Sequence, residues 1–146
     1  MKEKAYRFQL HFNAMHNIEP DKPEKMHAHT FRIIVYLRGD LEDITVYNQC
    51  ETVVRDYLKR FQGTRLNHMP QFKDRIPRLE VICEVFFEEM DKILASNQVS
   101  LIKLEIGDSP LSTYSIAKEL LVGSIYHRIS EEEYQIYLNE MQERYE

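Results

Sequence analysis

The sequence predicts one α+β domain whose elements follow the order strand, strand, helix, helix, strand, strand. Three observations support this prediction. Apolar and polar residues alternate near the start of the chain, apolar residues then recur at helical spacing in two long segments, and a strand pattern returns after them. The 146 residues match the size of one domain, and 43% hydrophobic with 29% charged residues is typical of globular proteins. We therefore expect residues 1–146 to form a single domain.

The first two strands are expected at residues 6–12 and 29–37. In the first segment apolar side chains occupy every second position, which is the period of a strand with one buried face. The second segment is rich in β-branched and aromatic residues and ends before Gly39-Asp40. Residues 13–25 contain several turn-forming residues, so we expect a connection too long for a tight hairpin.

Two helices are expected in the middle of the chain. Asn48 and Glu51 have the spacing of a capping box, and apolar residues follow at helical spacing as far as Gly63. A second helix is expected from Pro77 to about Leu94, because a proline at its start is followed by one apolar stripe. Each helix therefore has a face to bury.

The later elements are two further strands and a terminal helix. Residues 99–107 have a strand pattern, and residues 111–116, beyond a turn, form a weaker one. Ser130 and Glu133 make a capping box at the start of a final helix, so residues 117–146 are expected to be a helical C-terminal extension. Its expected role is to cover the sheet or a neighbouring subunit, and the alternative is a helix that recruits a partner.

Charge and cysteine content exclude several classes of protein. A net charge of −5 gives no general attraction for nucleic acids or anionic membranes. The N-terminus lacks the apolar run of a signal peptide, and no stretch approaches the roughly 20 apolar residues that span a bilayer. Cys50 and Cys83 lie inside the helical patterns without metal-site spacing, so reduced, buried thiols are expected. We expect a cytoplasmic protein without nucleic-acid or membrane partners.

Three histidines are candidate metal ligands. His27 and His29 alternate at the start of the second strand, so their rings project from the same face. His16 follows the first strand, and an antiparallel neighbour would carry it to the start of the second. Three neutral histidines with an open fourth position is the pattern of catalytic zinc sites. The alternative is a set of exposed or hydrogen-bonded histidines, as expected for the other three in the chain.

Several segments resemble, in order, the 6-pyruvoyltetrahydropterin synthase and 6-carboxytetrahydropterin synthase family. Residues 12–16 are similar to its F-x-A-A-H segment, and residues 27–29 are similar to its H-G-H segment. Residues 66–70 resemble its L-N-x-I-P stretch, and residues 77–80 resemble the P-T-x-E start of a helix. The resemblance covers about residues 6–116.

The resemblance implies a T-fold, in which a four-stranded antiparallel sheet has two helices between its second and third strands. Such domains assemble into ring-shaped homo-oligomers, and a trimer-based hexamer is expected here. The resemblance also implies Zn²⁺ on His16, His27 and His29, and a small-molecule pterin held by Glu105. A carboxylate at that position accepts two parallel N–H bonds from a pterin. The alternative is an ordinary carboxylate at a strand end.

The residues that transfer protons depart from the family pattern. No cysteine precedes the histidine pair, and residues 24–29 instead resemble a variant E-x-x-H-G-H pattern, so Glu24 is the candidate catalytic acid or base. An exposed loop glutamate is the alternative. The family's L-D-H segment aligns with residues 61–63, where Gln62 and Gly63 cannot relay protons.

Two hypotheses follow. The first is a zinc-dependent lyase similar to these synthases, acting on a dihydropterin triphosphate such as 7,8-dihydroneopterin triphosphate in pterin, folate or deazapurine biosynthesis. The candidates to bind the triphosphate group of this substrate are the cationic side chains of Lys22, Lys25 and Arg65. The second is a diverged, non-catalytic module that binds zinc and a pterin and has lost the proton-transfer residues.

Overall fold

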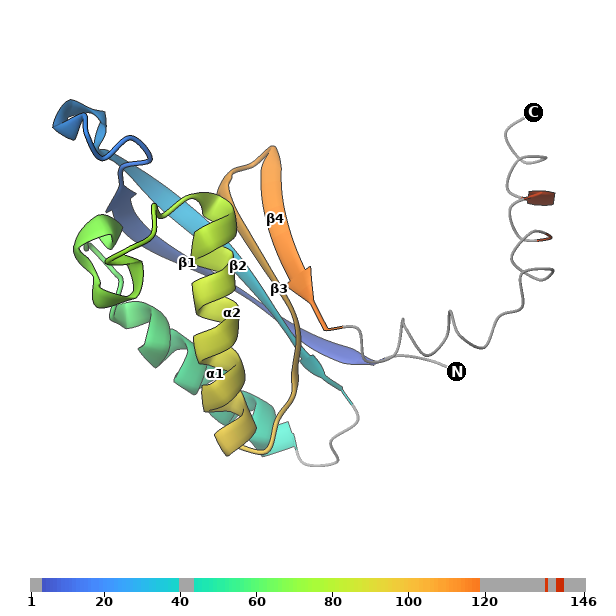
Figure 1. Cartoon of the computed structure of the whole chain (residues 1–146). Helices are drawn as coiled ribbons and strands as arrows, with labels where there is room; N and C mark the ends of the chain where they lie inside the picture. The colour runs from blue at the N-terminus through green and yellow to red at the C-terminus, as the bar shows by residue number, and fades with distance from the viewer. Residues whose placement is uncertain (1–3, 40–43, 119–135, 137–138, 141–146) are drawn as a thin grey trace.

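The protein, described here by a computed structural model, folds around one four-stranded sheet (Figure 1). The structure describes residues 4–39, 44–118, 136 and 139–140. The strands are β1 (Ala5–His16), β2 (His27–Arg38), β3 (Leu101–Ser109) and β4 (Ser112–Ala117), paired antiparallel in the order β1-β2-β3-β4. This topology confirms the predicted T-fold architecture.

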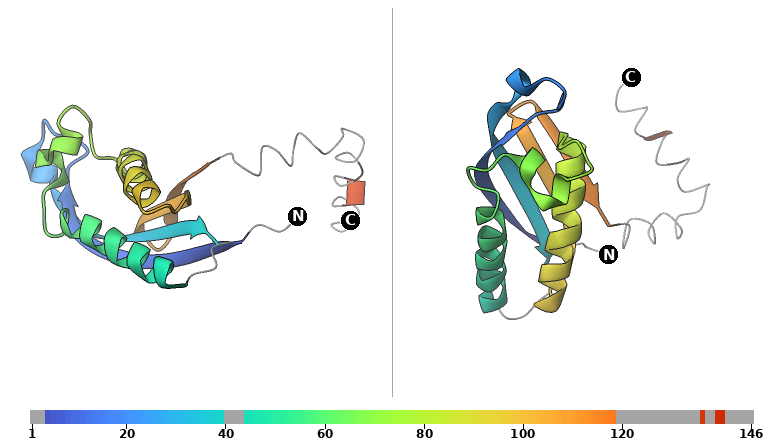
Figure 2. Two further views of the ribbon diagram at one scale, coloured as in Figure 1. Left: turned by 90° about the horizontal axis from the view of Figure 1, so that it is seen from below. Right: turned by 60° about the vertical axis from the view of Figure 1, so that its left-hand side comes forward.

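Two helices lie between β2 and β3 in the sequence and cover one face of the sheet (Figure 2). They are α1 (Ile44–Lys59) and α2 (Leu79–Ser96). Alternate residues of the strands point toward them, which leaves the other face of the sheet uncovered among the described residues. The core is built from large apolar side chains of both layers, including Phe12, Phe31, Ile33, Phe86 and Leu104.

β1, β2 and α1 are longer than the sequence predicted, whereas β3 and β4 have the predicted lengths and begin one or two residues later. β1 continues to His16 and β2 begins at His27, so the candidate ligands belong to the strands themselves. The prediction that Asn48 caps the first helix is wrong, because α1 begins at Ile44. Tyr47 explains the extra turn: its side chain is buried, and its hydroxyl donates a hydrogen bond to the Arg38 carbonyl.

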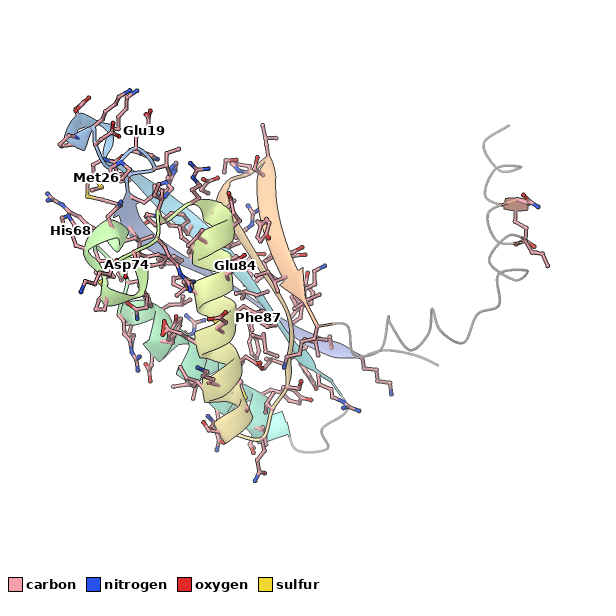
Figure 3. All side chains as sticks on the ribbon, viewed as in Figure 1. Glu19, Met26, His68, Asp74, Glu84 and Phe87 are labelled. Carbon is pink, nitrogen blue, oxygen red and sulfur yellow. The ribbon has the colours of Figure 1, made fainter. Side chains whose placement is uncertain are left out.

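Two loops meet beyond the end of β1. Residues 17–26 include the short 3-10 turn Pro23–Lys25, and residues 65–76 include the 3-10 turns Leu66–His68 and Pro70–Phe72. Figure 3 shows Glu19 and Met26 on the first loop, with His68 and Asp74 on the second. The segment that leads into the second loop runs along the edge of β1, where the Met15 N–H donates to the Thr64 carbonyl at 2.8 Å. These loops surround the end of the sheet that carries the histidines.

The remaining predictions on the fold have mixed outcomes. Cys50 and Cys83 are buried free thiols, as predicted. No helix in the described part of the chain is both long enough and apolar enough to cross a membrane. Almost all of the predicted terminal helix lies outside the described residues. Within this segment the structure describes residues 136 and 139–140, which are helical. The C-terminal extension therefore stays a prediction.

Candidate metal centre

His16, His27 and His29 come together at one end of the β1–β2 pair. The register places His16 directly opposite His27 and Ala14 opposite His29, so all three rings share one face. Each residue offers one ring nitrogen, and these nitrogens lie within 4.8 Å of one another. The ring centroids are 4.5 to 5.1 Å apart, with the rings edge to face. The structure thus groups the three residues that the sequence singled out.

Backbone carbonyls orient two of these rings. Nδ1 of His16 is 2.8 Å from the Pro77 carbonyl oxygen, and Nδ1 of His27 is 2.9 Å from that of Lys25. Because a carbonyl only accepts, each Nδ1 carries the proton and donates it, which leaves Nε2 with a free lone pair. Histidine ligands of metals are held in this way, with the second nitrogen bonded to an outer partner.

Nε2 of His16 is the observation that fits a metal best. It is fully buried and has no hydrogen-bond partner among the described residues, while the His16 side chain as a whole is 3% exposed. A buried polar atom without a partner costs about 1–3 kcal/mol, so such atoms call for an explanation. A zinc ion bound by the three histidines would satisfy it, and three imidazoles with an open position are a donor set that zinc accepts.

The electrostatic surroundings keep His16 ready to bind a metal. Burial lowers the pKa of His16, and the neighbouring His27 and His29 lower it further. The hydrogen bond with the Pro77 carbonyl and the charge of Asp108 act in the opposite direction without reversing the shift. His16 is therefore neutral at pH 7, the form that ligates metals.

Asp108 is a residue of this site that the sequence reasoning missed. It follows Leu104 and Ile106 at two-residue spacing on β3, and both of those side chains are buried in the core on the histidine side of the sheet. It is partly buried, and its charge acts on His16. The strand extends to Ser109, whereas the sequence reasoning placed Asp108 in a turn. The two-residue spacing from buried positions is the signal that could have found it.

Glu105 is not brought together with the histidines. It lies between Leu104 and Ile106, so its side chain points to the uncovered face of the sheet. There its carboxylate accepts a hydrogen bond from the Tyr36 hydroxyl at 3.3 Å and forms an ion pair with Lys103 at 3.1 Å. These contacts describe a carboxylate engaged on the opposite side of the sheet.

Glu24 lies in the 3-10 turn that leads into β2. Its side chain is exposed and makes no hydrogen bond or ion pair with other described residues. The two lysines beside it differ, because Lys22 and Lys25 both form ion pairs with Glu19, at 3.5 and 3.7 Å. Within the described residues, the Glu24 carboxylate is therefore available to contact a substrate.

A family model described as 6-pyruvoyl tetrahydropterin synthase matches residues 6–119. The chain belongs to this family. Because members of the 6-pyruvoyl tetrahydropterin synthase family are lyases, membership supports a tetrahydropterin synthase-like enzyme. The family is typically zinc-dependent, which agrees with the grouping of the histidines.

Solved structures with the same fold include members of the 6-pyruvoyl tetrahydropterin synthase family. The Caenorhabditis elegans 6-pyruvoyl tetrahydropterin synthase matches with a TM-score of 0.67 and 17% identity, over 81% of this chain and 97% of that one. An uncharacterized protein from Wolinella succinogenes matches with a TM-score of 0.52 and 15% identity, over 80% of this chain and 99% of that one. At these identities the likeness shows the fold alone. No curated protein gives a significant match to the sequence.

The positions that align with the L-D-H segment of the 6-pyruvoyl tetrahydropterin synthase family have a structural role in this chain. The Gln62 side chain accepts a hydrogen bond from the Asn13 N–H at 2.8 Å, and the Gly63 N–H donates to the Asn13 carbonyl at 2.6 Å. Gly63 has a φ of 72°, a conformation that favours glycine. Gln62 thus completes the edge of β1 and offers no group that exchanges protons at neutral pH.

Proposed function

We propose that the protein is a zinc-dependent lyase acting on a dihydropterin triphosphate such as 7,8-dihydroneopterin triphosphate. The single observation that carries this proposal is the histidine cluster, in which the buried Nε2 of His16 has no hydrogen-bond partner among the described residues. Family membership supports the class of reaction. A place in pterin, folate or deazapurine biosynthesis, a ring-shaped homo-oligomer and a cytoplasmic location stay predictions.

His16, His27 and His29 would hold the zinc ion. Bound there, zinc would supply a Lewis acid that polarises a substrate oxygen. The Pro77 and Lys25 carbonyls fix the tautomers of His16 and His27, so the free nitrogens need no rearrangement to bind. The protein therefore supplies a metal site that is organised before the metal arrives.

Glu24 would transfer protons, and Asp108 would bind the pterin. Glu24 would exchange protons with the substrate, since its carboxylate forms no hydrogen bond or ion pair with the residues that the structure describes. Asp108 would anchor the pterin, because a carboxylate accepts two parallel N–H bonds from its amino group and ring nitrogen. Its position on the histidine side of β3 supports Asp108 in this role, whereas the placement of Glu105 on the other face does not support Glu105.

Turnover of 7,8-dihydroneopterin triphosphate by zinc-loaded protein tests the proposal, with products separated by chromatography and metal content measured in parallel. Glu24→Gln is expected to lower kcat by a factor of about 10² to 10⁴, the usual contribution of a general acid or base. Zinc content is expected to stay unchanged. Glu88→Gln is the matched control, because Glu88 is an exposed carboxylate of α2 without a contact in the described chain. Unchanged turnover in Glu24→Gln would remove Glu24 from the mechanism.

The second candidate function is a non-catalytic module that binds zinc and a pterin. The engagement of Gln62 with Asn13 favours it, because the chain offers no proton relay at positions 62 and 63. This candidate predicts tight binding of the pterin by zinc-loaded protein without turnover. Any zinc-dependent product would exclude it.

A further inference from the structure

The loop of residues 17–26 connects two of the three candidate ligands. Its first residue, Asn17, follows His16, and its last residue, Met26, precedes His27. Most of its residues are exposed, and its regular structure is the short 3-10 turn Pro23–Lys25. An exposed segment with few buried side chains opens readily unless hydrogen bonds hold it. The hydrogen bonds of this loop therefore determine how it presents the histidines at its ends.

Asn17 is the buried residue of this loop, with 2% of its surface exposed. Its side-chain oxygen accepts a hydrogen bond from the Glu19 N–H at 2.8 Å, and its side-chain amide donates to the Lys22 carbonyl at 2.9 Å. The backbone N–H and carbonyl of Asn17 also have partners, both on one side chain of the second loop. Asn17 thus fixes the first half of the loop through all of its polar groups.

Asn67 is the partner that joins Asn17 to the rest of the domain. The Asn17 N–H donates to Oδ1 of Asn67, and Nδ2 of Asn67 donates back to the Asn17 carbonyl, both at 2.8 Å. The two bonds define the orientation of this amide, because its oxygen accepts and its nitrogen donates. Leu66, directly before Asn67, is fully buried in the hydrophobic core. The core therefore holds Asn17 in place through Asn67.

A continuous path of hydrogen bonds leads from Asn17 to the His27 ring. The Lys22 carbonyl, which accepts from the Asn17 side chain, also accepts from the Lys25 N–H at 3.0 Å. The Lys25 carbonyl in turn is 2.9 Å from Nδ1 of His27, which donates to it. His27 is an exposed residue, so packing in the core does not hold its ring. The orientation of this ring depends on where the loop places the Lys25 carbonyl.

His16 is oriented by another part of the fold. Its side chain is buried, and its Nδ1 is 2.8 Å from the Pro77 carbonyl at the entrance to α2. The loop of residues 17–26 takes no part in that hydrogen bond. The two rings therefore have separate supports, and the ring of His16 serves as an internal reference for that of His27.

We propose that Asn17 and Asn67 are positioning residues of the metal centre. Acting through the backbone of Lys22 and Lys25, they hold His27 in the tautomer that leaves its Nε2 free for a metal ion. Neither asparagine belongs to the histidine cluster itself. The link to metal binding rests on the function proposed above, whereas the link to the His27 ring does not. Outer partners of metal-bound histidines typically contribute a factor of about 10 to 100 in metal affinity.

Nitrogen-15 NMR of the metal-free full chain tests the effect on His27, at about pH 8, where a free imidazole is neutral. Asn67→Ala breaks the contact between the two loops, and Asn17→Ala breaks the contact with the Lys22 carbonyl. In both variants the Nδ1–H tautomer of His27 is expected to lose its dominance, while His16 keeps its own. A general loss of stability would not separate the two rings in this way.

Competition with a zinc-binding dye measures the metal affinity of the same proteins. Both variants are expected to bind zinc at least about tenfold more weakly than the wild type. Tyr57→Phe is the matched control, because it removes a partly buried hydrogen bond of 3.1 Å between Tyr57 on α1 and Glu89 on α2. This control is expected to destabilise the fold and to leave the zinc affinity unchanged.

Two results would overturn the proposal: a His27 tautomer that is unchanged in both variants, or an equal change at His16. An equal loss of zinc affinity in Tyr57→Phe would attribute the loss to stability and would overturn the role in the metal centre. If Asn17→Ala does not fold, Asn67→Ala gives the answer, because Asn67 is only partly buried.

Failure of this proposal and failure of the proposed function are distinguishable. A wild-type protein that binds no zinc refutes the zinc-dependent lyase, and the NMR comparison of His27 with His16 still tests the loop. Zinc-dependent turnover together with an unchanged His27 tautomer in both variants retains the lyase and removes Asn17 and Asn67 from the metal centre.

Discussion

Zinc is expected to stabilise the folded protein, and replacement of His29 by alanine is expected to abolish that stabilisation. The three ring nitrogens already lie within 4.8 Å of one another, and two of the rings are held by carbonyls. The unfolded chain has no such grouping, so zinc binds the native state preferentially. Binding to the native state alone raises the free energy of unfolding.

The size of the effect follows from mass action. At a free zinc concentration 100 times the dissociation constant, the free energy of unfolding rises by about 2.7 kcal/mol. For a chain of this length each kcal/mol shifts the melting temperature by roughly 2–4 °C, so an increase of about 5–10 °C is expected. Burial lowers the pKa of His16, which favours the neutral imidazole that a metal binds.

Thermal denaturation followed by circular dichroism, in chelator and then in excess zinc, measures this shift. His29→Ala is expected to melt at the same temperature in both conditions. His11→Ala is the matched control, because His11 is an exposed histidine on β1 outside the cluster, and it is expected to keep the full shift. An equal zinc shift in His29→Ala and in the wild type would refute the assignment of the ligands.

Three further outcomes are expected. Asn67→Ala removes both hydrogen bonds between Asn17 and Asn67, which join the loop of residues 17–26 to that of residues 65–76. The variant is expected to lower the free energy of unfolding, measured with urea, by about 1–3 kcal/mol. A change below about 0.5 kcal/mol would contradict a stabilising role for these hydrogen bonds. Burial raises the pKa of Cys83 to about 12, so above pH 9 the unfolded state loses a proton that the native state keeps. The free energy of unfolding should therefore fall as pH rises from 9 toward 12, and this group contributes up to about 1.4 kcal/mol per pH unit. The fall is expected to be less steep in Cys83→Ser. The same pH dependence in the variant and in the wild type would refute this prediction. Asp108→Asn is expected to weaken pterin binding at least about tenfold, measured by calorimetry, while Glu105→Gln leaves it unchanged, and the reverse order would return the pterin anchor to Glu105.

The order of elements was predictable because strand and helix periods are local properties. Alternation of apolar and polar residues identified β1, and β-branched and aromatic content identified β2. The apolar stripes identified α1 and α2. Boundaries were less predictable, because tertiary contacts extend the elements. The first turn of α1 depends on the burial of Tyr47 and its bond to the Arg38 carbonyl, which no local pattern reveals.

Some features of the candidate site could be predicted from the sequence, and others depend on the folded structure. The grouping of His16 with His27 and His29 follows from strand pairing and could be predicted from position alone. Asp108 was missed because its placement depends on where β3 ends. The engagement of Gln62 with the edge of β1 joins segments far apart in the sequence, so only the folded structure reveals it.

The hydrogen bond between His16 and the Pro77 carbonyl affects when the metal centre forms during folding. The three histidines belong to one pair of adjacent strands, so a β1–β2 hairpin would bring them near each other early in folding. The acceptor that orients His16 lies 61 residues away, at the entrance to α2, and reaches it only when the helical layer docks on the sheet. Closing a loop of this length costs more chain entropy than pairing β1 with β2, so this contact is expected to form after the two strands have paired. A partly folded chain would hold zinc loosely, and the gain in affinity as refolding proceeds would report the docking of α2.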